Sequence, residues 1–319
     1  MRKRAGILVF AVAAALACPV GAQENKPKAE RIADGVWAVQ PLKGANVGWF
    51  LFGDGVIAVD SGADAATGKE ILDLIAETTS KKPVRALVLT HLHADHSGGA
   101  RAFVAAGARV ICQENVAGQA LAAVTQAATD PADPLAGKAN LRPVVESISE
   151  RAILVDGLRN VQIYFLGPAH TKGDLIVYLA NEKILFAGDV AANGRLPFMQ
   201  SPDVDPLGWE RALATIAKVS PEKMVPGHGP IGPVSGIADS LAYVGRVAAI
   251  AKKIVDHGIR DEMLDAEIRT GENKIENVPL TDAHIANVKA AIKVMKEKIT
   301  RQPTPGASSG PTPVPTHSP

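Results

Sequence analysis

The chain has 319 residues, enough for one large domain or two ordinary ones, and 47% of them are hydrophobic, so a substantial core can form. Lys and Arg number 34 and Asp and Glu number 33, which gives a formal net charge of +1. This near-balance argues against a broad basic surface for nucleic acids. We therefore expect a small-molecule substrate and no nucleic-acid partner.

The N-terminus has the pattern of a bacterial export signal. Basic residues at positions 2–4 precede an apolar run at 5–17, which is too short for a comfortable membrane span. The small residues "VGA" favour cleavage after Ala22, so residues 1–22 are expected to be a signal peptide. The mature protein would then be periplasmic or secreted, without stable membrane insertion.

The two cysteines lead to different expectations. Cys18 offers an alternative to cleavage after Ala22, because "LAC" can serve as a lipid-attachment motif, although Ala15 at its outer position makes the motif weak. Cys112 is left alone once the signal is removed, and one thiol cannot close an intrachain disulfide. It lies in a strand-like apolar run, so we expect a thiol in the core.

The first half of the chain alternates strand and helix signals. The predicted strands are 35–40, 46–52, 55–60, 84–89 and 108–113, and the predicted helices are 67–80, 99–107 and 115–127. A loop rich in Pro, Asp and Gly follows at 130–137.

The second half begins with another β-rich block and ends in helices. The predicted strands are 151–155, 161–167, 174–180, 183–188 and 223–227, and the predicted helices are 206–220, 237–257, 261–269 and 281–300. Two β-rich halves that each carry helices indicate an α+β fold, with two sheets face to face and helices outside.

Three segments are expected after the signal peptide. A single domain covers 29–258, and a helical extension at 259–301 would cap the pocket or form an oligomer contact. Residues 302–319 are rich in Pro, Ser and Thr and are expected to be disordered.

Three histidines and an aspartate lie within six residues at the end of the predicted strand 84–89: His91, His93, Asp95 and His96. In extended backbone, residues i and i+2 point to the same side, so the first two histidines can reach one ion. The other two side chains would point to a neighbouring position. Burying four such groups unpaired would cost several kcal/mol, so the cluster indicates metal binding.

The pattern of a strand followed by a Gly-flanked ligand recurs at His170, Asp189 and His228. A turn-forming role is the alternative for each of these residues alone. Together with the first cluster, they indicate a larger metal centre. The remaining histidines are assigned no ligand role: His257, His284 and His317.

The motif H-x-H-x-D-H at 91–96, followed in order by His170, Asp189 and His228, resembles that of the metallo-β-lactamase superfamily over about residues 32–258. The resemblance implies an αββα sandwich with its metal site at one edge. It also implies that Asp189 bridges two zinc ions and that Asp60 orients a ligand histidine; a plain turn residue is the alternative for Asp60. The implied ligands of the first ion are His91, His93 and His170, and those of the second are Asp95, His96 and His228.

Such a site implies an exported binuclear zinc hydrolase for an ester, lactone, thioester or β-lactam, with hydroxide held between the metals as the nucleophile. Asp95 and Asp189 are the candidate catalytic carboxylates. The aspartate at position 189 makes the chain resemble the glyoxalase II and general hydrolase branches of the superfamily, because many of its β-lactamases have a cysteine at this position. Lys172 and Phe198 are candidate substrate contacts; a solvated lysine and a buried Phe in a surface loop are the alternatives.

A second activity is compatible with the same fold. Persulfide dioxygenases bind one iron through residues that match His91, His170 and Asp189. Two histidines and one carboxylate suit Fe(II) and O₂. Metal analysis distinguishes the two, because the hydrolase would hold two Zn²⁺ ions and the dioxygenase one iron.

Overall fold

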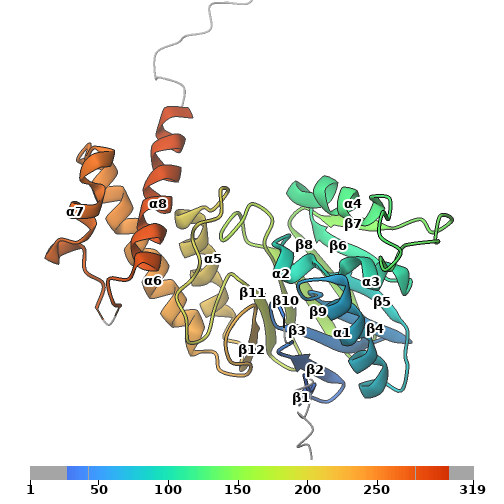
Figure 1. Ribbon diagram of the computed structural model, residues 1–319. Coiled ribbons are helices and arrows are strands. Elements are labelled where there is room, and N and C mark those ends of the chain that lie inside the picture. Colours follow the sequence, from blue (N-terminus) through green and yellow to red (C-terminus); the bar gives the residue numbers. More distant parts are fainter. Residues whose placement is uncertain (1–26, 42, 277, 302–319) are drawn as a thin grey trace, which may run out of the picture.

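Two β-sheets stack face to face and carry helices on their outer sides (Figure 1). The computed structural model describes residues 27–41, 43–276 and 278–301. The predicted signal peptide at 1–22 and the predicted tail at 302–319 lie outside these residues. The four-layer α+β sandwich predicted from the sequence is confirmed.

The first sheet has seven strands in sequential order, antiparallel from β1 to β4 and parallel from β4 to β7. Its strands are β1 (Glu30–Ala33), β2 (Val36–Val39), β3 (Val47–Phe52), β4 (Gly55–Val59), β5 (Val84–Val88), β6 (Arg109–Gln113) and β7 (Val145–Ile148). Because β4 and β5 are parallel, the residues that follow them meet at one edge of the sheet.

The second sheet has the order β12-β11-β10-β9-β8. Strands β11 and β12 are parallel, whereas β9 and β11 both run antiparallel to β10. The carboxyl ends of β9, β11 and β12 therefore share one edge. The strands are β8 (Arg151–Val155), β9 (Asn160–Phe165), β10 (Leu175–Leu179), β11 (Ile184–Gly188) and β12 (Lys223–Pro226).

The alternation of side chains along the strands separates three apolar layers. On β3, Trp49 points outward to the helices of the first sheet, and Phe50 points into the space between the sheets. On β10, Tyr178 faces the outer helices, and Val177 faces the other sheet. Both faces of each sheet are thus covered, which explains why the central strands are apolar throughout.

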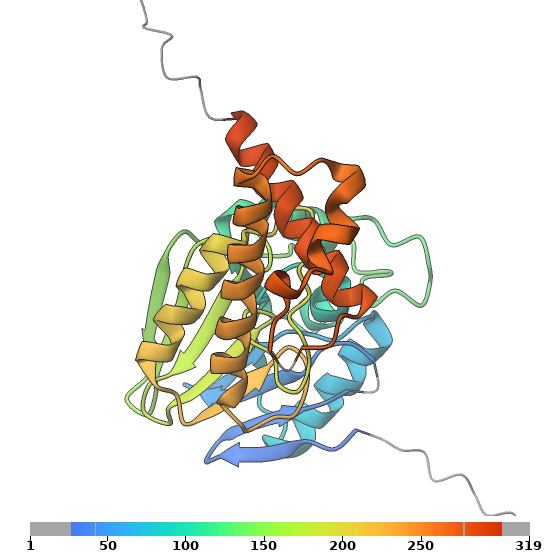
Figure 2. The ribbon, with the colours of Figure 1, turned by 90° about the vertical axis from the view of Figure 1, so that its left-hand side faces the viewer.

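The helices form the two outer layers. Helices α1, α3 and α4 pack on the first sheet, and α5 and α6 pack on the second. Helix α8 lies on the outer side of α6, which also contacts α5 (Figure 2). The α-helices are α1 (Ala65–Thr78), α2 (Ala94–Ser97), α3 (Ala100–Ala105), α4 (Ala117–Thr125), α5 (Pro206–Val219), α6 (Ser235–Asp256), α7 (Leu264–Ile268) and α8 (Asp282–Arg301). The 3₁₀ turns are η1 (Glu114–Val116), η2 (Asp261–Met263) and η3 (Gly271–Asn273). No described helix is long and apolar enough to cross a membrane.

Three short elements are absent from the sequence-based expectation: β1, β7 and α2. The edge strand β1 has no fully buried residue, and β7 buries only Ile148 completely, so their apolar signal is weak. Helix α2 is a four-residue turn within the histidine cluster. Cys112 lies on β6 as a buried free thiol, as expected. The domain boundary near residue 258 stays a prediction.

Candidate metal centre

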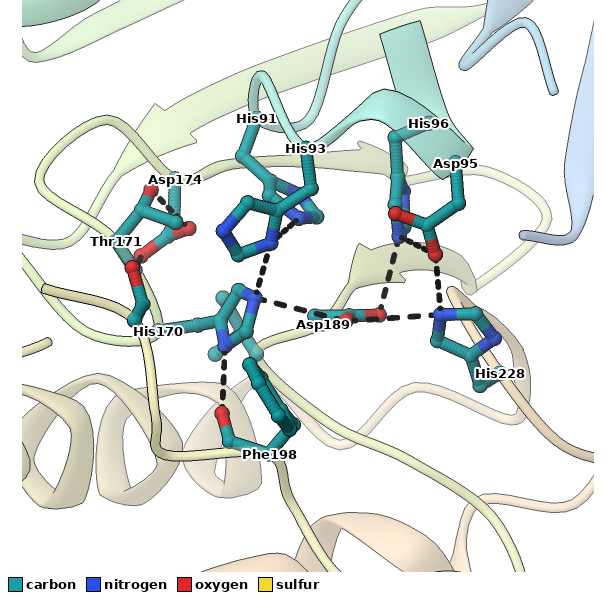
Figure 3. A network of polar contacts seen from close by, with 12 residues as sticks. His91, His93, Asp95, His96, His170, Thr171, Asp174, Asp189, Phe198 and His228 are labelled. Atoms are coloured by element: carbon teal, nitrogen blue, oxygen red, sulfur yellow. Dashed lines mark hydrogen bonds and ion pairs between the residues drawn. The ribbon is translucent and has the colours of Figure 1, made fainter. Parts of the chain in front are cut away.

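The candidate ligands come from loops at the strand ends of both sheets (Figure 3). His91 follows β5, and the cluster continues through α2, which carries Asp95 and His96. In the second sheet His170 follows β9, while Asp189 directly follows β11, and His228 comes two residues after β12. The shared edges described above bring these seven side chains together, although they span residues 91–228 of the chain.

His91, His93 and His170 form the first trio, and their ligand atoms lie within 4.8 Å of one another. Nδ1 of His93 is 3.0 Å from Nε2 of His91 and 2.9 Å from Nε2 of His170. Three ring nitrogens thus converge on one position, which is the geometry that a shared cation requires. The structure brings together the set that the sequence resemblance assigns to the first ion.

Asp95, His96 and His228 form the second trio, which has the same 4.8 Å spread. Oδ2 of Asp95 lies 2.9 Å from Nε2 of His228 and 3.8 Å from Nε2 of His96. His96 is fully buried, whereas the side chain of Asp95 is 40% exposed. The second trio therefore has one side toward solvent.

Asp189 lies between the two trios (Figure 3). Its Oδ1 is 3.3 Å from Nε2 of His96, and its Oδ2 is 3.6 Å from Nε2 of His170 and 3.7 Å from Nε2 of His228. One carboxylate thus reaches ligands of both trios, as the predicted bridging role requires. A Cβ at Gly227 would lie 2.1 Å from Oδ1 of Asp189, so only glycine fits beside the bridge.

Two buried polar atoms test whether a metal fits. Nε2 of His96 and Oδ1 of Asp189 face each other at 3.3 Å as an ion pair, and neither makes a hydrogen bond within the described residues. Burial lowers the pKa of His91 well below its usual value and the pKa of His170 to about 4, so both rings are neutral near pH 7. Converging neutral imidazoles beside a carboxylate can hold a cation, and this donor set suits zinc.

The charge balance in the second trio also favours a cation. Burial lowers the pKa of His96, but the carboxylates of Asp60 and Asp189 outweigh it and raise the pKa to about 10. Burial raises the pKa of Asp189, but the neighbouring histidines, His96 above all, hold it well below its usual range. A positive charge is therefore stabilised between these side chains, and a metal ion supplies one without a proton.

Asp60 supports the centre from behind. It accepts hydrogen bonds at 2.8 Å from Nδ1 of His96, from the backbone N–H of Thr90 and from the Thr90 hydroxyl. The Thr90 hydroxyl also lies 3.2 Å from Nδ1 of His91. Asp60 thus orients one ligand histidine directly and a second through Thr90, which agrees with its expected role. The sequence analysis missed Thr90, because a threonine before a histidine carries no motif of its own.

Asn46 and Asp174 hold ligand-bearing loops and are also missing from the expected site. Asn46 donates to the carbonyls of Pro226 and Gly229, on either side of His228. Asp174 accepts from the backbone N–H and the hydroxyl of Thr171, the residue after His170. Burial raises the pKa of Asp174 to about 7. Both residues act through backbone geometry, which a ligand motif does not record.

The two candidate substrate contacts differ in position. Phe198 is 44% exposed, and its ring centroid lies 6.2 Å from that of His170, so it lines the rim of the metal centre and is not buried. Lys172 is partly exposed, and the structure gives contacts for its backbone alone, with Asn115 and Asp203. A substrate contact by either side chain stays a prediction.

Two further histidines within the described residues, His257 and His284, lie outside the candidate centre. His257 ends α6, and His284 is buried in α8, where Nδ1 lies 3.1 Å from the Tyr243 hydroxyl. Neither belongs to a ligand group among the described residues, and His317 lies outside them.

Comparison with known proteins identifies the class that this fold and site define. Residues 42–228 match the family model of the metallo-beta-lactamase superfamily, and this match covers more than half of the chain. The protein therefore belongs to the metallo-beta-lactamase superfamily. The predicted superfamily is confirmed, while the hydrolase activity and the branch within the superfamily stay predictions.

Individual relatives are distant. The chain is 25% identical to a linear primary-alkylsulfatase of Pseudomonas sp. (strain ATCC 19151) over 60% of this chain and 44% of that protein. It is 25% identical to a type 2 metallo-beta-lactamase of Bacillus cereus over 56% of this chain and 64% of that protein. It thus spans less than two thirds of either relative. The solved metallo-beta-lactamase from Pontibacter korlensis has the same fold, with a TM-score of 0.57 and 24% identity over 69% of this chain and 99% of that chain.

Proposed function

We propose that the protein is a binuclear zinc hydrolase that cleaves a small substrate of the ester, lactone, thioester or β-lactam type. The observation that carries this proposal is the pair of trios joined by Asp189. Bound zinc would lower the pKa of a water molecule and polarise the scissile bond. Four candidate ligand side chains beyond the iron-type set of His91, His170 and Asp189 lie at the same centre, which favours two zinc ions over one iron.

The two carboxylates have separate tasks in this proposal. Asp189 is largely buried and ionised, so it can hold the two trios in a fixed relation. Asp95 is ionised near neutral pH, because a hydrogen bond from His228 lowers its pKa against the opposing effect of burial. Its partly exposed oxygens can accept a proton from the attacking water and return it to the leaving group.

The rim of the centre is suited to a small substrate with an apolar part. The exposed ring of Phe198 offers an apolar surface beside His170, and Lys172 would offer a positive charge to an anionic group. Because one relative is an alkylsulfatase, sulfate esters belong in the substrate screen alongside β-lactams. The N-terminal pattern supports export to the periplasm, where such a hydrolase would meet substrates from outside the cell.

A substrate screen with metal analysis tests the proposal. Zinc-loaded protein is assayed with β-lactams, lactones, thioesters and alkyl sulfates, and bound metal is measured by mass spectrometry. We expect two zinc ions per chain and hydrolysis in at least one substrate class. Asp189→Ala should lower turnover by at least about a hundredfold.

Asp73→Ala is the matched control, because Asp73 is an exposed aspartate on α1 that pairs with Lys69. Its turnover should equal that of the wild type. Wild-type turnover in Asp189→Ala contradicts the proposal. One iron per chain with oxygen consumption on a persulfide would instead establish the dioxygenase alternative.

A further inference from the structure

The loop between β11 and α5 has little backbone support of its own. Residues 194–200 belong to no helix or strand, and across the described part of the chain they make no backbone–backbone hydrogen bond. Such a segment would usually vary in position. Phe198 in this loop nevertheless contacts the candidate metal centre.

The carbonyl of Phe198 accepts a hydrogen bond from Nδ1 of His170 at 2.9 Å (Figure 3). This bond places the imidazole proton on Nδ1. The lone pair of Nε2 is then directed at the position on which the nitrogens of the first trio converge. His170 is completely buried, so no solvent molecule substitutes for this acceptor. The direction of a metal ligand thus depends on where the loop places one carbonyl group.

Asn287 of α8 fixes that loop on both sides of Phe198. Its Nδ2 donates to the carbonyl of Pro197 at 2.8 Å, and its Oδ1 accepts from the backbone N–H of Met199 at 3.0 Å. Nδ2 also donates to the Tyr243 hydroxyl at 2.9 Å. Asn287 is 3% exposed, and a polar side chain at such a place is stable because its amide is engaged on both sides.

We propose that Asn287 is a positioning residue of the metal centre, which directs Nε2 of His170 through the carbonyl of Phe198. The inference rests on the proposed metal site and extends it, because α8 lies beyond the 42–228 region that matches the superfamily model. The C-terminal helix would therefore support the first trio through the loop at 194–200, in addition to packing on α6.

Metal affinity tests the inference without any substrate. Zinc binding is measured by competition with a chromophoric chelator for the wild type, Asn287→Ala and Asn287→Asp. The variant His170→Ala lacks a ligand of the first trio, so the binding step that it weakens identifies the zinc ion of that trio. Asn287→Ala should lower the zinc affinity of the first trio about tenfold, which is the lower end of the effect of hydrogen-bond partners of metal ligands. The affinity for the other zinc ion should stay within about twofold of the wild-type value. The visible spectrum of the Co(II)-loaded variant should change with it.

Asn273→Ala is the matched control. Asn273 is equally buried in the same extension, but its amide donates only to Glu267 and Thr270. Its variant should bind both zinc ions like the wild type. Asn287→Asp keeps the size of the side chain and the acceptor for Met199 but loses the donor to Pro197 and Tyr243. A loss of zinc affinity at the first trio is therefore expected, and this variant decides the question if Asn287→Ala does not fold.

Two results would overturn the inference: unchanged affinity in a folded Asn287 variant, or equal weakening of both ions, which marks a general loss of structure. The proposed function fails separately. A wild type that binds two zinc ions and hydrolyses none of the screened substrates would contradict the hydrolase and leave the role of Asn287 intact.

Discussion

At the scale of single residues, Asp60 combines an unusual backbone with a central contact. Its φ angle is 62°, in the left-handed region that residues other than glycine seldom adopt. Local strain of this kind costs about 1–3 kcal/mol and persists where the surrounding structure enforces it. The strained backbone of Asp60 places its carboxylate within hydrogen-bond distance of both Thr90 and His96.

Replacing Asp60 by Asn tests this role. The variant keeps the shape but loses the charge and one acceptor site, so His96 is less firmly held. We expect the zinc affinity of the second trio to fall about 10–100-fold. Asp64→Asn is the control, because Asp64 caps α1 through Thr67 and contacts no candidate ligand. Equal zinc affinity in the wild type and Asp60→Asn would contradict an orienting role.

Cys112 gives a second prediction at this scale. Burial raises the pKa of its thiol to about 11, so the folded state holds the thiol protonated up to that pH. Since the unfolded thiol has a pKa near 9.0, its contribution to stability is complete below pH 9 and is lost as the pH rises toward 11. At pH 8 the folded protein, expressed from residue 23, should not react with Ellman's reagent, whereas the unfolded protein should titrate one thiol. Rapid reaction of the folded protein would show that Cys112 is accessible.

The candidate ligands are the part of the site that sequence could predict. A short cluster such as His91, His93, Asp95 and His96 has no purpose in packing, so its chemistry is readable from the order of residues. Asn46, Thr90 and Asn287 could not be predicted in the same way. They act on backbone groups far away in sequence, and an isolated Asn or Thr has many structural uses.

At the scale of elements, the contact between the sheets depends on one small residue. Gly48 on β3 lies against the ring of Phe186 on β11, and a Cβ at Gly48 would come within 2.1 Å of that ring. Phe186 is 1% exposed and lies in the layer between the sheets, so its ring has little room to move. The close approach of the two sheets therefore requires glycine at this position.

Gly48→Ala should lower the free energy of unfolding by about 1–3 kcal/mol, measured by urea denaturation, because it overpacks the space between the sheets. Gly118→Ala is the control. Gly118 is exposed on α4 with no neighbour within 4 Å, so alanine there should raise stability by up to about 1 kcal/mol. If Gly48→Ala is as stable as the wild type, the contact with Phe186 is not tight.

Central elements could be predicted from sequence better than peripheral ones. Strands such as β4 and β10 are buried along their whole length, so their apolar runs stand out. The edge strands β1 and β7 pair on one side and are largely exposed, so backbone hydrogen bonds define them more than side chains do. The pairing order of the strands was not predictable either, because it depends on contacts between distant segments.

At the scale of the whole molecule, metal binding should be coupled to stability. The centre joins loops from both sheets, so bound ions would add a link between two halves that also meet through the apolar layer and through hydrogen bonds such as those from Lys223 to Ile32 and from Arg159 to Leu51. Binding to the folded state alone adds about 4 kcal/mol when free zinc is a thousandfold above its Kd. Removing zinc with a chelator should lower the Tm by on the order of 10 °C, measured by calorimetry, and adding zinc back should restore it. An unchanged Tm after addition of the chelator would mean that metal binding is not coupled to the stability of the fold.

The claim on which this account depends is that seven side chains from both sheets hold two cations. Anomalous diffraction from crystals of the zinc-loaded protein, recorded at the zinc absorption edge, tests it most directly. We expect two peaks, one among the nitrogens of the first trio and one within the second, with Asp189 between them. A single peak, or peaks away from these residues, would contradict the binuclear centre.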